Sequence, residues 1–461
     1  MRLTVIGTGY LGAVHAACMA DIGHEVLGVD IDAEKIAALK EGRVPFFEPG
    51  LQDVLGRTVG SGRLRFTTSL DEAADFGDVH FVCVNTPQRR DSPAADLRAV
   101  DAVIDGLAPR LSRRCLIVGK STVPAGTTAR LTARVQELVP EGTDVEVAWN
   151  PEFLREGFAV QDTLRPERLV AGVWSQRADE TLREVYAPML RVGVPYISTD
   201  PATAELVKVA ANSFLATKIS FINAMAEVCD ATGADVVTLA DALGYDTRIG
   251  RRFLSAGLGF GGGCLPKDIR AFTARADELG IGSAVSFLRQ IDEINMRQRR
   301  RTVDIARDMV GGGFEGRCIA VLGATFKPDS DDVRDSPALA VVAAIHREGA
   351  DVRLHDPEGM DNARAVLPML EYAPDVTKAC EGADLVLHLT EWTDYRRIDP
   401  AALAAVTPAR KILDARNALD AALWRSAGWT LRSLGRPTPP PLPSQQRAVD
   451  HVSSVCSAES G

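Results

Sequence analysis

Residues 2–30 place a buried strand, a glycine-rich turn, a helix and a second strand in one order, and this order constrains the fold most strongly. Gly7, Gly9 and Gly12 follow the first apolar run in GxGxxG spacing, and the second apolar run ends at Asp30. In a dinucleotide-binding unit the first glycine makes the turn, the second lets a pyrophosphate approach the backbone, and the third lets helix and strand pack closely. An aspartate after the second strand pairs with ribose hydroxyls and repels a 2′-phosphate. The pattern therefore predicts a Rossmann-type domain that binds NAD rather than NADP.

A glycine-rich segment at 259–268, GFGGGCLPKD, surrounds a single cysteine. Pro266 suits the first turn of a helix and the apolar residues after it repeat at helical spacing, so we expect Cys264 just before a helix N-terminus. The positive partial charge of that terminus and the nearby Lys267 would lower the pKa of the thiol. The glycines let the backbone approach a ligand. Cys264 is therefore a candidate nucleophile, with a buried structural cysteine as the alternative.

The composition is typical of a large globular enzyme. The 461 residues are 46% hydrophobic and 25% charged, and a chain of this length forms about three domains. The net charge of −10 argues against nucleic-acid or membrane partners, so a phosphate site needs a local cluster of Lys and Arg. The cysteines lack metal-ligand spacing, which argues against a bound metal and suits a reducing cytoplasm. Because the first strand begins at residue 2 and no apolar run approaches a membrane span, we expect a cytoplasmic protein without a signal peptide.

Hydrophobic patterning divides the chain into three folded blocks and a tail. Residues 1–200 alternate strands with helices, residues 201–312 are helical, and residues 313–435 return to the alternation. The sequence thus predicts an α/β fold with two Rossmann-like, doubly wound parallel-sheet domains joined by a central helical domain. Residues 436–461 contain RPTPPPLPSQQ and predict a disordered, proline-rich tail.

The patterning also locates the linking helix and the strands. A long amphipathic run over residues 201–229 is expected to join the two sheet domains as one helix. Its predicted apolar face consists of Leu206, Val209, Phe214, Ile222 and Met225. Beyond residue 30, strands are expected at 80–87, 115–124, 318–323, 351–356, 384–390 and 411–417.

The second α/β block lacks the glycine fingerprint. After its first strand, Lys327 stands where a dinucleotide fold would place a glycine. Arg334 and Arg416 add positive charge at the sheet edge where ligands collect, and this cluster suits a nucleoside diphosphate. Solvated surface charge is the alternative for each residue taken singly.

Two pairs of polar residues lie between these landmarks. Glu152 and Glu156 share a face if their segment is helical, and Lys208 and Asn212 share one side of the central helix. Thr122 follows a strand at its carboxyl end, beside the expected nicotinamide. Taken singly, such residues are often only solvated surface residues. As a group they are candidates for a catalytic role.

Residues 1–435 resemble one known family, the nucleotide-sugar 6-dehydrogenases. The segments that carry the resemblance are GTGYLG (7–12), STVP (121–124), NPEFLREG (150–157), Lys208 with Asn212, RIGRRFLSAGLGFGGGCLPKD (248–268) and FKPDSDDVRDSP (326–337). The resemblance implies an N-terminal NAD domain, a central helical domain that carries a dimer contact, and a C-terminal domain that holds a UDP-sugar. Gly263, Asn85 and Ala415 depart from the usual pattern.

The resemblance also implies a reaction. This is the NAD-dependent, two-step oxidation of the C6 hydroxyl of UDP-glucose to UDP-glucuronate through a thiohemiacetal and a thioester on Cys264. The alternatives are the same chemistry on GDP-mannose or a UDP-N-acetylhexosamine, a single-step hydroxyacid-type dehydrogenase, and an NAD-binding protein without catalysis.

By the same resemblance, site residues fall into three groups. The catalytic group is Cys264, Lys208, Asn212, Asp268, Thr122 and Glu156. The cofactor group is Gly7, Gly9, Tyr10, Leu11, Gly12, Asp30, Lys35, Thr86, Thr122, Glu156, Lys267 and Arg334. The substrate group is Glu152, Phe153, Leu154, Arg155, Lys208, Asn212, Arg248, Phe253, Leu254, Ser255, Ala256, Gly257, Gly261, Lys327 and Arg416, with Arg248 expected to reach the substrate of a neighbouring subunit.

Overall fold

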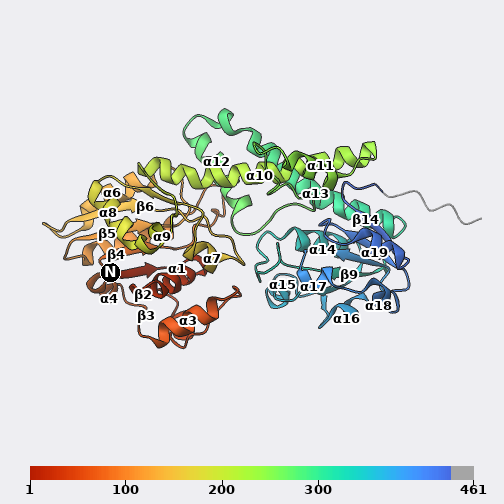
Figure 1. Cartoon of the computed structure of the whole chain (residues 1–461), viewed down its shortest axis with the longest axis horizontal. Coiled ribbons are helices and arrows are strands. Elements are labelled where there is room, and N and C mark those ends of the chain that lie inside the picture. The colour runs from red at the N-terminus through yellow and green to blue at the C-terminus, as the bar shows by residue number, and fades with distance from the viewer. Residues whose placement is uncertain (438–461) are drawn as a thin grey trace, which may run out of the picture.

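The computed structural model describes residues 1–437, so the predicted tail at 436–461 lies almost entirely outside the described residues. Two sheet domains lie at opposite ends of the molecule, and the helices of the central block run along one side of both (Figure 1). Helix α10 (Pro201–Thr232) spans the distance between them, as the amphipathic run predicts. The α/β fold with two sheets and a long linking helix is confirmed.

The N-terminal sheet has eight strands within the described residues, in the order β3-β2-β1-β4-β5-β6-β7-β8. The strands are β1 (Arg2–Ile6), β2 (Glu25–Val29), β3 (Leu64–Thr67), β4 (Val79–Val82), β5 (Cys115–Gly119), β6 (Val145–Trp149), β7 (Leu169–Gly172) and β8 (Tyr196–Thr199). Neighbours pair in parallel, except that β6 and β7 meet antiparallel where Trp149 lies opposite Gly172. The strand order reverses between β1 and β4, and sheets of this kind bind ligands at that switch point.

Helices cover both faces of this sheet. They are α1 (Tyr10–Asp21), α2 (Ala33–Lys40), α3 (Leu51–Gly60), α4 (Leu70–Phe76), α5 (Arg98–Leu107), α6 (Thr127–Leu138), α7 (Ala159–Leu164), α8 (Gln176–Val185) and α9 (Ala187–Arg191). Successive strand residues point to opposite faces, so Val5 joins the core under α1 while Ile6 joins the core under α5. Burial on both faces explains why the strands read as continuous apolar runs.

The central block consists of α10, α11 (Val236–Gly244), α12 (Leu265–Glu278) and α13 (Phe287–Met309). On α10, Val209 and Ile222 are buried as predicted, but Leu206 is 41% and Phe214 is 65% exposed. Only part of the predicted broad apolar face of α10 is therefore packed within this chain. No helix among residues 1–437 is long and apolar enough to cross a membrane.

The C-terminal sheet is parallel throughout its described strands, in the order β11-β10-β9-β12-β13-β14. Its strands are β9 (Cys318–Leu322), β10 (Asp351–His355), β11 (Glu371–Tyr372), β12 (Leu385–His388), β13 (Lys411–Asp414) and β14 (Thr430–Ser433). The helices around it are α14 (Pro337–Arg347), α15 (Met360–Val366), α16 (Val376–Cys380), α17 (Thr393–Arg396), α18 (Pro400–Ala404) and α19 (Ala421–Ser426). Every strand predicted in this block is present.

Candidate active site

The turn between β1 and α1 has the geometry of a dinucleotide site. A Cβ built on Gly12 would lie 1.8 Å from the carbonyl oxygen of Gly7, so this glycine lets α1 pack against the turn. A Cβ on Gly9 would instead meet only the side chain of Asn85, at 3.9 Å. Gly9 also occupies the N-cap position and has no side chain to cap α1. The open space and the uncapped N–H groups fit a pyrophosphate.

Asp30 lies at the end of β2 beside this turn. Its Oδ2 accepts a hydrogen bond from the Thr8 N–H at 2.8 Å and pairs with Lys35 Nζ at 3.0 Å. Burial would raise the pKa of Asp30, but hydrogen bonds from the Asp32 N–H and from Lys35 more than offset it and lower the pKa below its ordinary value. Asp30 is therefore ionised and placed to accept hydrogen bonds from ribose hydroxyls.

Three polar residues from two central helices meet around the cysteine loop. Asn212 of α10 donates from its Nδ2 to Asp268 Oδ2 of α12 at 2.6 Å, and both residues are buried. Lys208, one turn before Asn212, is 5% exposed and pairs with Glu152 at 2.9 Å. The structure thus brings together an ammonium, an amide and two carboxylates. Lys208 and Asn212 lie on one helix, as predicted. Residues 151–155 are not helical, so Glu152 and Glu156 do not share a helix face.

The ammonium of Lys208 remains charged despite its burial. Burial lowers the pKa of Lys208, but Glu152, Cys264 and Asp268 raise it above its ordinary value. The ring of Phe153 lies 5.7 Å from Lys208 Nζ and covers the ammonium on one side. A fixed positive charge in a partly desolvated site is suited to stabilising a developing oxyanion.

Cys264 precedes α12 as its N-cap residue, as predicted, and is exposed to solvent on one side. Protein surrounds the thiol elsewhere, and this burial raises the pKa of Cys264 to about 12, although Lys208 acts to lower it. The expected lowering by the helix terminus and Lys267 is therefore wrong. Lys267 is instead paired with Asp268 at 2.7 Å, and Lys208 is the cation that acts most strongly on the thiol.

Glu156 lies at the junction of the two sheet domains. Its Oε1 pairs with Arg334 at 3.1 Å, its Oε2 accepts from the Ser330 hydroxyl at 3.4 Å, and its carbonyl oxygen accepts from Lys327 Nζ. Burial, reinforced by Asp332, raises the pKa of Glu156 to about 7, with Arg334 and Lys327 opposing. A carboxyl group that titrates near neutrality is suited to accepting and returning a proton.

The glycines of the cysteine loop contact protein rather than open space. A Cβ on Gly261 would lie 2.3 Å from the carbonyl oxygen of Asp335, and one on Gly262 would lie 2.8 Å from the Phe326 ring. The expectation that these glycines let the backbone approach a ligand is thus only part of the account. They also let the loop pack against the C-terminal domain.

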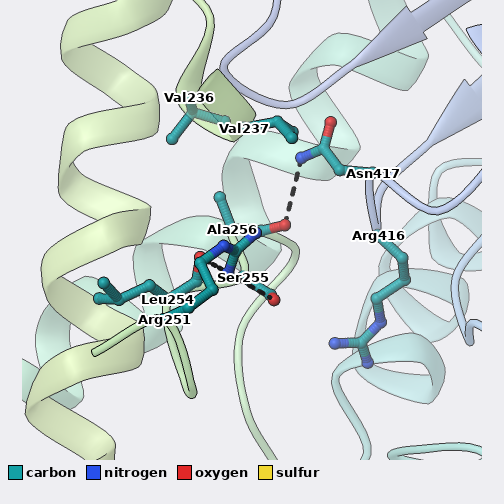
Figure 2. A pocket seen from close by; sticks show the side chains of 8 residues that line it. All are labelled: Val236, Val237, Arg251, Leu254, Ser255, Ala256, Arg416 and Asn417. Carbon is teal, nitrogen blue, oxygen red and sulfur yellow. Dashed lines mark hydrogen bonds between the residues drawn. The ribbon is translucent and has the colours of Figure 1, made fainter. Parts of the chain in front are cut away.

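Arg416 follows β13 and faces the segment 253–257 across a small cavity of about 70 Å³ (Figure 2). The cavity is lined by Val236, Val237, Arg251, Leu254, Ser255, Ala256, Arg416 and Asn417. Asn417 donates to the carbonyl oxygen of Ala256 at 3.2 Å, and Arg416 donates to that of Gly259 at 3.2 Å. Predicted substrate residues from two domains therefore lie beside one another.

Other predicted residues lie further from the cluster or have different partners. Thr86 donates to the carbonyl oxygen of Thr122 at 2.7 Å, so these two residues adjoin at the ends of β4 and β5. Arg155 pairs with Asp162 at 2.7 Å. The Arg248 side chain is 87% exposed and contacts Asp246, so within this chain it does not join the site.

The sequence reasoning missed three buried charged residues. Lys120, 6% exposed, donates to the side-chain oxygen of Asn150 at 2.9 Å, and burial lowers its pKa to about 8. Glu48 and Glu205 are buried carboxylates that bind backbone N–H groups of other segments. In the sequence each of these three residues is a charged residue next to an apolar run. That pattern does not reveal which group the buried charge contacts.

Comparison with known proteins agrees with this geometry. Models of the UDP-glucose/GDP-mannose dehydrogenase family match as an NAD binding domain at residues 1–190, a central domain at 202–297 and a UDP binding domain at 320–421. The UDP-glucose 6-dehydrogenase of Rhizobium meliloti (strain 1021) is 42% identical over 439 residues, which is 95% of this chain and 100% of that protein.

Solved structures extend the comparison. A UDP-glucose dehydrogenase from Pyrobaculum islandicum has a TM-score of 0.85 at 38% identity, covering 93% of this chain and 98% of that one. A UDP-D-ManNAc dehydrogenase from Pyrococcus horikoshii has a TM-score of 0.82 at 26% identity, covering 95% and 99%. Because the three family domains match in order along a chain with this fold and an NAD-type turn, the protein belongs to the UDP-glucose/GDP-mannose dehydrogenase family and is an NAD-dependent oxidoreductase.

Proposed function

We propose that this protein oxidises the C6 hydroxyl of UDP-glucose to a carboxylate, giving UDP-glucuronate. The observation that carries the proposal is the position of Cys264 at the start of α12, beside the cluster of Lys208, Asn212 and Asp268. A single oxidation of an alcohol needs no nucleophile, whereas oxidation of an aldehyde to an acid needs a group that adds to the carbonyl first. The cysteine therefore favours four-electron chemistry over a single-step dehydrogenase.

The first oxidation removes a hydride from C6 and a proton from its hydroxyl group, and leaves an aldehyde. NAD bound in the N-terminal domain would accept the hydride in this step, and a second molecule of NAD would accept the hydride of the second oxidation. The Lys208 ammonium and the Asn212 amide stabilise the C6 oxygen as its proton leaves. Glu156, with its pKa of about 7, accepts this proton, and Thr122 helps to position water.

Cys264 then adds to the aldehyde carbon. Burial raises the pKa of the thiol, so its proton passes to the aldehyde oxygen as the sulfur–carbon bond forms, and Lys208 stabilises that oxygen. Removal of two further electrons converts this thiohemiacetal into a thioester. Water attacks the thioester carbon and the carbon–sulfur bond breaks. The carboxylate product is released and the free thiol is regenerated.

Two features support UDP-glucose as the sugar nucleotide. The curated UDP-glucose 6-dehydrogenase compared above is 42% identical, against 26% for the UDP-D-ManNAc dehydrogenase. Lys327 and Arg416 supply positive charge at the strand ends of a domain that matches a UDP-binding model. Initial rates on UDP-glucose, UDP-N-acetylhexosamines and GDP-mannose, with NADH counted per sugar, test the proposal. We expect UDP-glucose to be preferred with two NADH per sugar; one NADH per sugar would contradict the two-step reaction.

Replacing Cys264→Ser tests the nucleophile. We expect steady-state UDP-glucuronate formation to fall more than about 1,000-fold, as when a covalent nucleophile is removed, while UDP-glucose still binds. Cys318→Ser is the matched control, because Cys318 lies in the C-terminal sheet away from the cluster. Mass spectrometry of acid-quenched wild-type protein should detect an acyl adduct on Cys264. Full turnover by Cys264→Ser would refute the assignment.

We further propose that the protein is a homodimer in which α10 packs against a second copy. Phe214, Phe221 and Val228 are spaced seven residues apart on α10 and are 65%, 45% and 51% exposed. An outward apolar stripe of this length is typical of a helix that packs on a partner. The exposed Arg248 is then free to reach the substrate of the other subunit, as the resemblance implies.

A further inference from the structure

A buried carboxylate outside the catalytic cluster contacts the turn that carries Glu156. Glu48 lies between α2 and α3 and is 6% exposed. Its Oε2 accepts from the Gly157 N–H at 2.7 Å, and its Oε1 accepts from the Ala159 N–H at 2.6 Å. The Tyr10 hydroxyl, from the first residue of α1, also donates to Oε2. All three donors converge on one carboxylate, so a neutral or shorter side chain could not satisfy them equally.

The same turn is held from its other side by the C-terminal domain. Gly157 has φ +79°, and a Cβ at this position would lie 2.7 Å from the carbonyl oxygen of Asp329. The Phe47 N–H, adjacent to Glu48, donates to Asp331 Oδ2 at 3.1 Å. The segment around Glu48 therefore contacts both the Glu156 turn and the loop that faces it.

We infer that Glu48 is a positioning residue: it fixes the backbone just after Glu156 and connects it, through Tyr10, to the dinucleotide turn. This inference rests on the role proposed above for Glu156. Glu48 touches neither the cysteine nor the groups around it, so its effect is transmitted through the Glu156 turn. The hydroxyl from which Glu48 accepts a hydrogen bond belongs to Tyr10, within the GxGxxG segment.

The charges that face Glu156 determine how a loosened turn would behave. Lys327, Asp332 and Arg334 face it from the C-terminal domain, and Cys264 faces it from the start of α12. Tyr10 faces it from α1, with Glu48 behind. Burial is the largest cause of the raised pKa of Glu156, so entry of water around a mobile turn would lower that pKa toward its ordinary value.

Glu48→Gln tests the inference, with Glu41→Gln as the matched control. The control removes the same charge from a nearby exposed residue whose partner is Arg43. In Glu48→Gln we expect kcat to fall about tenfold or more, with the KM for the nucleotide sugar and the Kd of NAD within about twofold. The inflection of the kcat–pH profile near pH 7 should move to lower pH. Glu41→Gln should leave rates and profile unchanged.

A second readout does not depend on turnover. Hydrogen exchange of a peptide that contains the Gly157 and Ala159 amides should become faster in Glu48→Gln and stay unchanged in Glu41→Gln. If Glu48→Gln does not fold, Tyr10→Phe removes one donor to the same carboxylate and should shift the pH inflection in the same direction by less. Unchanged exchange and an unmoved inflection would overturn the inference. The rates are measured on whichever nucleotide sugar the wild type oxidises. A wrong substrate assignment would appear in the wild type, whereas a wrong positioning role would appear only as an unchanged Glu48→Gln variant.

Discussion

At the scale of single residues, the surroundings rather than the residue type set the chemistry of this site. Cys264 has the helix-terminal position that the sequence predicts, yet burial raises the pKa of its thiol to about 12. Burial also raises the pKa of Glu156 to about 7. A protonated thiol beside a carboxyl group that titrates near neutrality fits a nucleophile that loses its proton only during the reaction.

Asp30→Ala tests the assignment of the cofactor domain at this scale. The variant should weaken NAD binding by roughly tenfold or more, because hydrogen bonds to a charged group contribute about 1.5–3 kcal/mol. UDP-glucose affinity should stay within about twofold, since the UDP binding domain model matches the other sheet domain. Calorimetric titration of each ligand measures both values, with the exposed Asp53→Ala on α3 as control. Equal weakening of both ligands would contradict the separation of the two sites.

At the scale of elements, buried carboxylates join helices that the sequence places far apart. Glu205 of α10 accepts hydrogen bonds from the Gly126 N–H at 2.7 Å and from the Thr128 N–H at 2.6 Å, at the start of α6. The Thr128 hydroxyl donates to the same carboxylate. These contacts satisfy N–H groups that a helix start leaves without partners, and they fix the end of the loop that begins at Thr122.

Glu205→Gln should therefore destabilise the N-terminal domain. An amide in place of the carboxylate presents an N–H to a backbone N–H, and the lost hydrogen bond costs about 2 kcal/mol. For a domain of this size we expect the thermal unfolding midpoint to fall by roughly 4–8 °C. Glu180→Gln, at an exposed position of α8, is the control and should leave the midpoint unchanged. An unaltered midpoint in Glu205→Gln would show that the cap contributes little.

At the scale of the whole molecule, the site lies where three regions meet. The N-terminal domain supplies Glu152 and Glu156, the central helices supply Lys208 and Cys264, and the C-terminal domain contributes the loop at 326–337. The arrangement of this cluster therefore depends on the relative position of the two sheet domains, which α10 spans (Figure 1). A helix with an outward apolar stripe is suited to hold this arrangement rigid within a dimer.

The double variant Phe214→Asp with Phe221→Asp tests that assembly. Two carboxylates in an apolar helix interface would lose their water without gaining a charged or hydrogen-bonding partner. Because burial of such unpaired charges is unfavourable, we expect the dimer to dissociate into monomers. Light scattering coupled to size-exclusion chromatography measures the mass. Val192→Asp, at a residue that is 74% exposed in the N-terminal domain, is the control. A dimeric mass in the double variant would exclude this face as the contact.

The sequence by itself determined the features that short-range patterns encode. Alternating and continuous apolar runs located the strands, the spacing of Gly7, Gly9 and Gly12 located the dinucleotide turn, and Pro266 placed Cys264 at a helix start. These signals work because strand, turn and helix geometry depend on neighbouring residues along the chain.

Only the tertiary structure decided which charges are buried together and what they contact. Glu48 and Gly157 are 109 residues apart, and Glu156 and Arg334 are 178 apart, so no local pattern could pair them. The pKa of a buried group depends on the water that folding removes and on the charges that folding brings near. For this reason the sequence indicated the cysteine as a candidate nucleophile, but the direction of its pKa shift followed only from the packing of three regions around it.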